Sequence, residues 1–149
     1  MTTVINDSSG PLDLLAIEVF EEKYGVILPH EYRSFLSQYN GGYPEPDCFN
    51  FVGSDDGSSV DKFLGLGVGE HSNLDDYTSS YKERIPIDFL PIAHDPGGNL
   101  IIIGISGEFQ NKIYFWDHEY ETESPSLENI CFVSESLTEF LENLYDIDF

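Results

Sequence analysis

The chain has 149 residues, 40% hydrophobic and 14% aromatic, which predicts one folded domain around one core rather than a disordered acidic tail. Asp and Glu number 28 against 6 Lys and Arg, so the net charge is -22. This charge repels phosphate backbones and anionic membranes and attracts basic proteins, so we expect no direct binding to nucleic acid or membranes. Two distant cysteines and no apolar run of ~20 residues predict a cytoplasmic protein with reduced thiols.

We expect residues 1–10 to form a flexible N-terminus, and two helices are predicted after them. Residues 11–24 begin with Pro11, which a first helical turn accepts, and Gly25 ends that helix. Residues 29–39 form the second helix, which stops at Asn40-Gly41-Gly42. The predicted apolar faces are Leu12, Leu15, Val19 and Phe20 on the first helix, and Tyr32, Phe35, Leu36 and Tyr39 on the second.

From Cys48 onward the hydrophobic period shortens towards two, which predicts strands. The predicted elements in chain order are strands 48–52 and 62–67 around a polar loop at 53–59, a short helix at 72–81, strands 89–94, 100–106, 112–117 and 130–134, and a helix that begins with the capping box Ser136-x-x-Glu139. The strand at 100–106 is apolar enough to be buried on both faces. The fold class is therefore α+β, with an N-terminal helical hairpin, a central mainly antiparallel sheet and a C-terminal helix.

The stretch AHDPGGNLI at residues 93–101 combines a histidine, an aspartate and two glycines, as active sites do. A phosphate-binding loop leads into a helix and usually carries a lysine, whereas these glycines lead into a β-branched strand. The residues suit a tight turn, because Pro96 and the glycines supply its backbone angles. We therefore interpret this stretch as a turn between two strands.

A metal site remains the chemical alternative at the strand ends. His94 and Asp95 could meet Asp117, His118 and Glu119 if neighbouring strands bring their ends together. No HExxH motif, paired cysteines or nucleophile elbow accompanies them. Hydrogen-bonded histidines at strand ends explain the pattern more simply. We expect no cofactor, no metal and no catalytic residue, and hence no enzyme.

Several tyrosines lie within acidic segments, where they suit the binding of a basic protein. The ring can anchor a partner while neighbouring carboxylates steer its approach, although scattered surface tyrosines need no such explanation. The candidate surface for binding a basic partner comprises Tyr43, Glu45, Asp47, Asp55, Asp56, Asp75, Asp76, Tyr77, Glu119, Tyr120, Glu121 and Glu123.

Two separated stretches resemble the SUKH superfamily of Smi/Knr-like domains. The first stretch, residues 20–44, reads FEEKYGVILPHEYRSFLSQYNGGYP and is similar to the family's G-x-x-LP joint, second helix and NGG stop. The second stretch, residues 89–119, reads FLPIAHDPGGNLIIIGISGEFQNKIYFWDHE and is similar to the family's F-P-I-A strand, D-x-GG/GN turn and Y-x-W-D-H strand end. The resemblance implies a single SUKH domain over residues 1–149. The matched residues, which we expect to determine the fold, are Leu28, Pro29, Asn40, Gly41, Gly42, Asp95, Gly97, Gly98, Asn99, Trp116 and Asp117.

What the resemblance implies about function is mainly binding. Bacterial members are typically immunity proteins that neutralise a cognate toxin, often a nuclease, in contact-dependent or polymorphic toxin systems. An acidic domain suits a basic toxin. The alternative is a regulatory protein-interaction scaffold like the fungal relatives that control cell-wall assembly, and a metal-binding hydrolase is a third reading. We expect a monomer or weak dimer.

Overall fold

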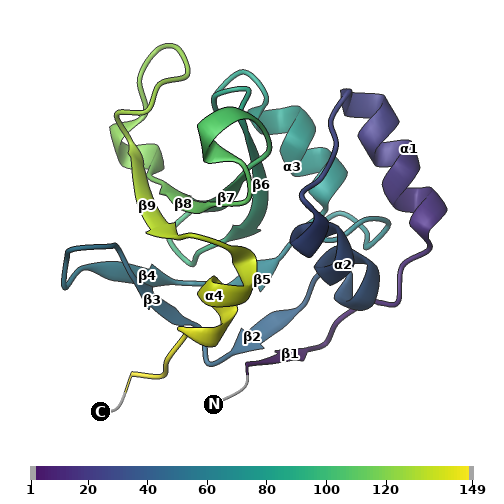
Figure 1. The fold of residues 1–149 in the computed structure, drawn as a ribbon, viewed down its shortest axis with the longest axis horizontal. Helices are drawn as coiled ribbons and strands as arrows, with labels where there is room; N and C mark the ends of the chain where they lie inside the picture. Colours follow the sequence, from purple (N-terminus) through teal and green to yellow (C-terminus); the bar gives the residue numbers. More distant parts are fainter. Residues whose placement is uncertain (1–2, 148–149) are drawn as a thin grey trace.

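The strands predicted in the second half of the chain form the main sheet of the molecule. The computed structural model describes residues 3–147, and it has the α+β architecture expected from the sequence (Figure 1). The helices are α1 (Leu14–Tyr24), α2 (His30–Tyr39), α3 (Leu74–Tyr81) and α4 (Leu137–Glu142), with short 3-10 turns η1 (Gly107–Phe109) and η2 (His118–Tyr120). The strands are β1 (Val4–Asn6), β2 (Tyr43–Glu45), β3 (Cys48–Asn50), β4 (Gly57–Ser59), β5 (Lys62–Phe63), β6 (Phe89–His94), β7 (Leu100–Gly104), β8 (Ile113–Trp116) and β9 (Ile130–Ser134).

The main sheet is antiparallel, in the order β5-β6-β7-β8-β9, and its central strand is buried on both faces as predicted. Along β7, Ile101 and Ile103 point into the larger apolar cluster, which the helices α1, α2 and α4 complete. Leu100 and Ile102 point to the other face and join a smaller cluster around Trp116. The single core expected from chain length is therefore two clusters, one on each face of the sheet.

The first helix differs from its prediction at both its start and its buried face. Asp13, not Pro11, begins it: the Asp13 carboxylate caps the helix by accepting the Leu15 backbone N–H at 3.0 Å. Ile17 and Phe20 are buried, whereas Leu15 and Val19 are 63% and 58% exposed. The predicted stripe is therefore confirmed for Phe20 and for Leu12, which packs against the larger cluster, and is wrong for Leu15 and Val19. These two side chains face water because α1 lies at the periphery of the fold (Figure 1) and buries only one narrow side.

The second helix matches its prediction, and its stop residue also joins distant segments. Tyr32, Phe35 and Leu36 are buried, and Asn40 ends the helix in the left-handed conformation with φ of 50°. Its side-chain amide donates to the Leu66 carbonyl at 2.8 Å, and its side-chain oxygen accepts the Leu66 N–H at 2.7 Å. Asn40 thus fixes the segment after β5 to the end of α2.

Two short strand pairings lie outside the main sheet, and of their four strands only β3 was predicted. β1 pairs antiparallel with β2, so residues 4–6 of the expected flexible N-terminus are a strand, while residues 1 and 2 lie outside the described residues. β4 lies in the expected loop at 53–59 and pairs with β3. Its Gly57 allows close approach, because a Cβ there would lie 1.9 Å from the Phe49 carbonyl oxygen. Strands of only three residues, such as β1, β2 and β4, are too short to show a hydrophobic period in the sequence.

The final helix begins where its capping sequence predicts. The Ser136 hydroxyl oxygen accepts the Glu139 backbone N–H at 3.1 Å, and Leu137 and Phe140 are buried against the larger cluster. In the described part of the chain, no helix is both long and apolar enough to cross a membrane.

We expect the central strand to dominate stability. Ile102→Ala should lower the free energy of unfolding by about 2–5 kcal/mol, because Ile102 is fully buried and the deletion leaves a cavity. Ile87→Ala is the matched control, since Ile87 is 88% exposed. This substitution should change the free energy of unfolding by less than about 0.5 kcal/mol. Urea unfolding followed by tryptophan fluorescence measures both; equal effects would contradict the assignment of β7 as the centre of the core.

Candidate functional site

The turn between β6 and β7 is organised by a buried carboxylate. Asp95 is 6% exposed, and its Oδ1 accepts the backbone N–H groups of Gly97 at 2.9 Å and Asn99 at 2.7 Å. Its Oδ2 accepts the Asn99 side-chain amide at 3.0 Å and the Ser58 hydroxyl at 2.8 Å. Four donors offset the cost of removing this charge from water. Asp95 therefore has a structural role in the turn, as the sequence interpretation of AHDPGGNLI predicts.

The same network continues from the turn to the end of β8. The Asn99 side-chain oxygen accepts the His118 backbone N–H at 3.0 Å and lies 2.6 Å from His118 Nδ1. Gly98 has φ of +87°, and a Cβ there would lie 3.4 Å from the His118 ring. Hydrogen bonds thus connect β4, the turn at 95–99 and η2, three segments that are far apart in the sequence.

The tip of the β3–β4 hairpin and the segment from η2 to residue 123 each carry exposed carboxylates, and we call these residues together the acidic face. All of its members are exposed, and Tyr120, at 68% exposure, is the aromatic residue among them. The acidic face comprises Asp55, Asp56, Glu119, Tyr120 and Glu123. Beside it, a cavity of about 450 Å³ lies between the β3–β4 hairpin and the turn, lined in part by Asp55, Gly97 and Tyr145. In Figure 1 the loop between β8 and β9 projects at the upper left, above the β3–β4 hairpin.

Two carboxylates of the predicted surface are instead held in ion pairs. Glu121 accepts from Nε and Nη2 of Arg84, each at 2.8 Å, and these bonds lower the pKa of the Glu121 carboxyl. Asp75 accepts from Lys23 Nζ at 2.8 Å and from the Tyr24 hydroxyl, and both bonds lower its pKa. Because their charges are already matched inside the molecule, these carboxylates attract a basic partner less than the free ones do.

The three predicted tyrosines have different environments. Tyr77 is half-buried and stacks between Tyr81 and His94, with ring centroids 5.7 and 5.8 Å away, and burial raises the pKa of its phenol. Tyr43 on β2 is 40% exposed and carries the Lys62 ammonium 5.1 Å from its ring centroid. Only Tyr120 belongs to the acidic face.

The remaining predicted residues lie on other elements, so the candidate set does not form one surface. Glu45 accepts the Asn6 side-chain amide at 2.9 Å on β2, Asp47 precedes β3, and Asp76 is exposed on α3. In Figure 1, β2 lies at the bottom of the view and α3 near the top.

The two strand-end histidines make separate hydrogen bonds. His118 contacts Asn99, whereas His94 Nε2 lies 2.8 Å from the Ser72 hydroxyl and His94 Nδ1 lies 3.4 Å from Asp61. Within residues 3–147, no three or more His, Cys, Asp or Glu side chains are grouped so that they could hold a metal ion. These contacts match the simpler interpretation of hydrogen-bonded histidines at strand ends.

No sequence pattern predicts the Ser72, His94 and Asp61 arrangement, because its members come from three separate segments. The order of contacts is that of a catalytic serine relay, and Ser72 has φ of 56° just before the N-cap of α3. However, Ser72 is only 7% exposed, and the Tyr77 ring stacks on His94. The three residues join the start of α3 to the segment before β5 and to β6.

The fold-signature residues lie at joints of the structure. Leu28 and Pro29 are buried between α1 and α2, and Trp116 is fully buried with its ring edge-on to Tyr81. The Asp117 carboxylate caps η2 by accepting the Glu119 N–H at 3.0 Å. These positions agree with the resemblance of the sequence to Smi/Knr-like domains.

Comparison with known proteins decides the family. The model of the SMI1 / KNR4 family (SUKH-1) matches residues 11–143, a range that contains both signature stretches. The chain belongs to this family. It is also similar to the SPbeta prophage-derived uncharacterized protein YokK of Bacillus subtilis (strain 168), with 30% identity over 147 residues that cover 87% of this chain and 73% of that protein.

We expect Asp95 to be the residue on which the turn depends. Asp95→Asn should lower the free energy of unfolding by about 2–4 kcal/mol, because an amide replaces one accepting oxygen with a donor that faces other donors. Asp56→Asn, on the exposed hairpin tip, is the control for loss of one charge. Thermal unfolding compares them, and equal stability of the two variants would contradict the role of Asp95.

Proposed function

We propose that this SUKH protein is an immunity protein, which binds and neutralises a cognate basic toxin through the acidic face. The observation that carries the proposal is that exposed carboxylates and the exposed Tyr120 lie on or next to segments that the Asp95 network holds in place. Membership of the SUKH-1 family supports it, because the family resemblance implies toxin immunity for bacterial members.

The rigidity of these segments favours tight binding. Loops that are already ordered lose little conformational freedom on association, so more of the contact energy contributes to affinity. The two hydrogen bonds that fix η2 to Asn99 hold Glu119 and Tyr120 relative to the turn. Tyr120 can then insert its ring into the partner while Asp55, Asp56 and Glu119 steer the encounter.

Charge also suggests how neutralisation works. A toxin that cleaves nucleic acid holds phosphate groups with Arg and Lys, and carboxylates make the same charge-assisted hydrogen bonds with these side chains. The acidic face would then occupy the toxin surface that holds phosphates, so that substrate is excluded without a cofactor and without chemistry by the immunity protein. Such a role places the protein in the cytoplasm with the toxin's target. The name of the similar protein YokK records a prophage origin, which is compatible with a role in genetic conflict.

Co-expression tests the proposal directly. The toxin domain encoded next to this gene should form a stable complex with the protein, and the protein should restore growth of cells that express the toxin. Co-purification and colony counts measure the two outcomes. If neither a complex nor rescue is observed, the immunity proposal is wrong and a regulatory scaffold becomes the better reading.

Charge removal tests which face binds. The triple variant Asp55→Asn, Asp56→Asn, Glu119→Gln should slow association with the toxin about tenfold at low salt, and less at physiological ionic strength, because exposed charges steer the encounter. The control variant Glu22→Gln, Glu135→Gln, Glu142→Gln removes the same charge from exposed positions on or beside α1 and α4. Stopped-flow binding at several salt concentrations separates them; equal association rates for both variants would place the interface elsewhere.

A further inference from the structure

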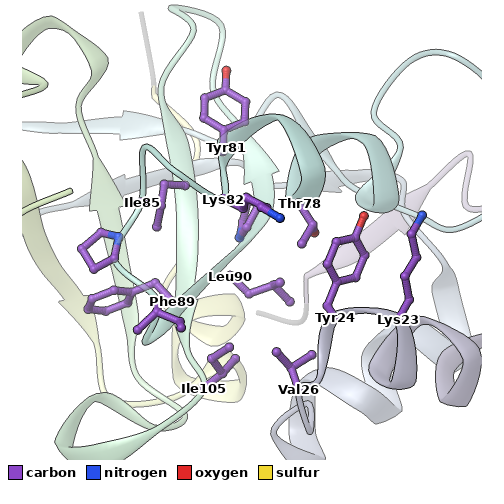
Figure 2. A pocket seen from close by; sticks show the side chains of 13 residues that line it. Lys23, Tyr24, Val26, Thr78, Tyr81, Lys82, Ile85, Phe89, Leu90 and Ile105 are labelled. Carbon is purple, nitrogen blue, oxygen red and sulfur yellow. The ribbon is translucent and has the colours of Figure 1, made fainter. Parts of the chain in front are cut away.

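A groove between α1 and α3 has a different chemical character from the acidic face. A cavity of about 320 Å³ lies where the end of α1, α3 and the first residues of β6 meet, and most of its lining is apolar. Figure 2 shows Tyr81, Lys82 and Ile85 above Leu90, with Val26 and Ile105 closing the lower side. None of the residues that line this cavity belongs to the acidic face.

The groove continues along α1 as a second hollow. This hollow has a volume of about 550 Å³, and Leu15, Val19 and Leu66 contribute apolar surface to it. Lys23 lines both hollows, and its ammonium crosses from α1 to Asp75 on α3 at 2.8 Å. An ion pair therefore spans the groove between two apolar hollows.

Apolar side chains exposed to water gather along this groove. Twelve large hydrophobic side chains among residues 3–147 are strongly exposed, and three of them, Leu15, Val19 and Ile87, line the two hollows. Leu14 on α1 and Ile27 on the loop after α1 are also exposed, outside the lining of both hollows. Ile27 and Ile87 are 81% and 88% exposed. Clustered exposed apolar surface of this kind is typical of a protein-binding site, since scattered single residues would not adjoin two hollows.

The groove also holds two of the six Lys and Arg residues of the chain. Lys23 is paired with Asp75, whereas the Lys82 ammonium forms no ion pair with any carboxylate of the described residues. In a protein of net charge -22, an unpaired lysine on an apolar cavity is a local site where a carboxylate is attracted. At physiological salt this contact outweighs distant charges, because screening acts over about 8 Å.

We propose that the α1–α3 groove binds a segment of a partner protein that presents large apolar side chains next to a carboxylate. The apolar side chains fill the two hollows, and the carboxylate pairs with Lys82. Ile87, which is 88% exposed at the groove, favours a protein segment over a small molecule, because a small ligand would leave this side chain in water. Repulsion between two copies of charge -22 disfavours self-association. This proposal does not depend on the immunity function.

A designed peptide tests the chemistry of the groove in the intact protein. The probe is a synthetic amphipathic helix with leucine at every third or fourth position and glutamate beside each leucine; the matched peptide has lysine in place of glutamate. The glutamate peptide should shift the methyl resonances of Ile87, Leu90 and Ile105, with a dissociation constant on the order of 1 mM or tighter. The absence of these shifts, or equal shifts of the same methyl groups by the lysine peptide, would overturn the proposal.

Variants locate the contact. Lys82→Glu and Ile87→Ser should each weaken binding of the glutamate peptide about tenfold, which corresponds to about 1.4 kcal/mol. The controls Lys112→Glu and Val52→Ser make the same chemical changes away from the groove, and should leave binding unchanged. Equal weakening by the controls would overturn the assignment. A concentration-dependent dimer in sedimentation experiments that Ile87→Ser abolishes would also overturn it, because a second copy would then be the occupant.

Discussion

The buried carboxylate of Asp95 is the constraint that fixes the loops at one end of this fold. A charge with 6% exposure is stable only where donors surround it. Those donors come from two places, the turn itself and Ser58 on β4. The hairpin β3–β4 and the turn between β6 and β7 must therefore be in place together. Asn99 also hydrogen-bonds to His118 of η2. The positions of the hairpin, the turn and η2 therefore all depend on the buried carboxylate of Asp95.

The sheet supports this arrangement because its central strand is covered on both faces. β7 directs Ile101 and Ile103 to one cluster and Leu100 and Ile102 to the other, and the turn with Asp95 directly precedes it. A well-packed strand resists displacement, since any shift would open cavities on two faces at once. The turn therefore has a rigid base. The buried side chains of β7 hold it in place, although the exposed carboxylates near the turn take no part in that packing.

Sequence patterns predicted those parts of the fold in which the backbone conformation requires a particular type of residue. Asn40 and the residues around Asp95 are such cases, because helix stops and tight turns need particular residues. The pairing of β1 with β2 depends on backbone groups, which every residue has, so no pattern marked it. The candidate surface was predicted only in part: acidity and tyrosine content are visible in composition, whereas the pairing of Glu121 with Arg84, 37 residues away in the chain, is a property of the fold.

The few cations explain how one molecule presents both an acidic face and an apolar groove. Three of the six Lys and Arg residues, Lys23, Arg33 and Arg84, form ion pairs with carboxylates. All three of these cations join separate segments: Lys23 joins α1 to α3, Arg33 joins α2 to α1, and Arg84 joins the loop after α3 to the segment after η2. Because these cations are placed at joints, the carboxylates of the hairpin tip and of Glu119 have no ion-pair partner among residues 3–147. Lys82, by contrast, pairs with no carboxylate in the described part of the chain, and the surface around it is apolar. The uneven distribution of only six cations thus separates a surface suited to a basic partner from one suited to an apolar, acidic segment.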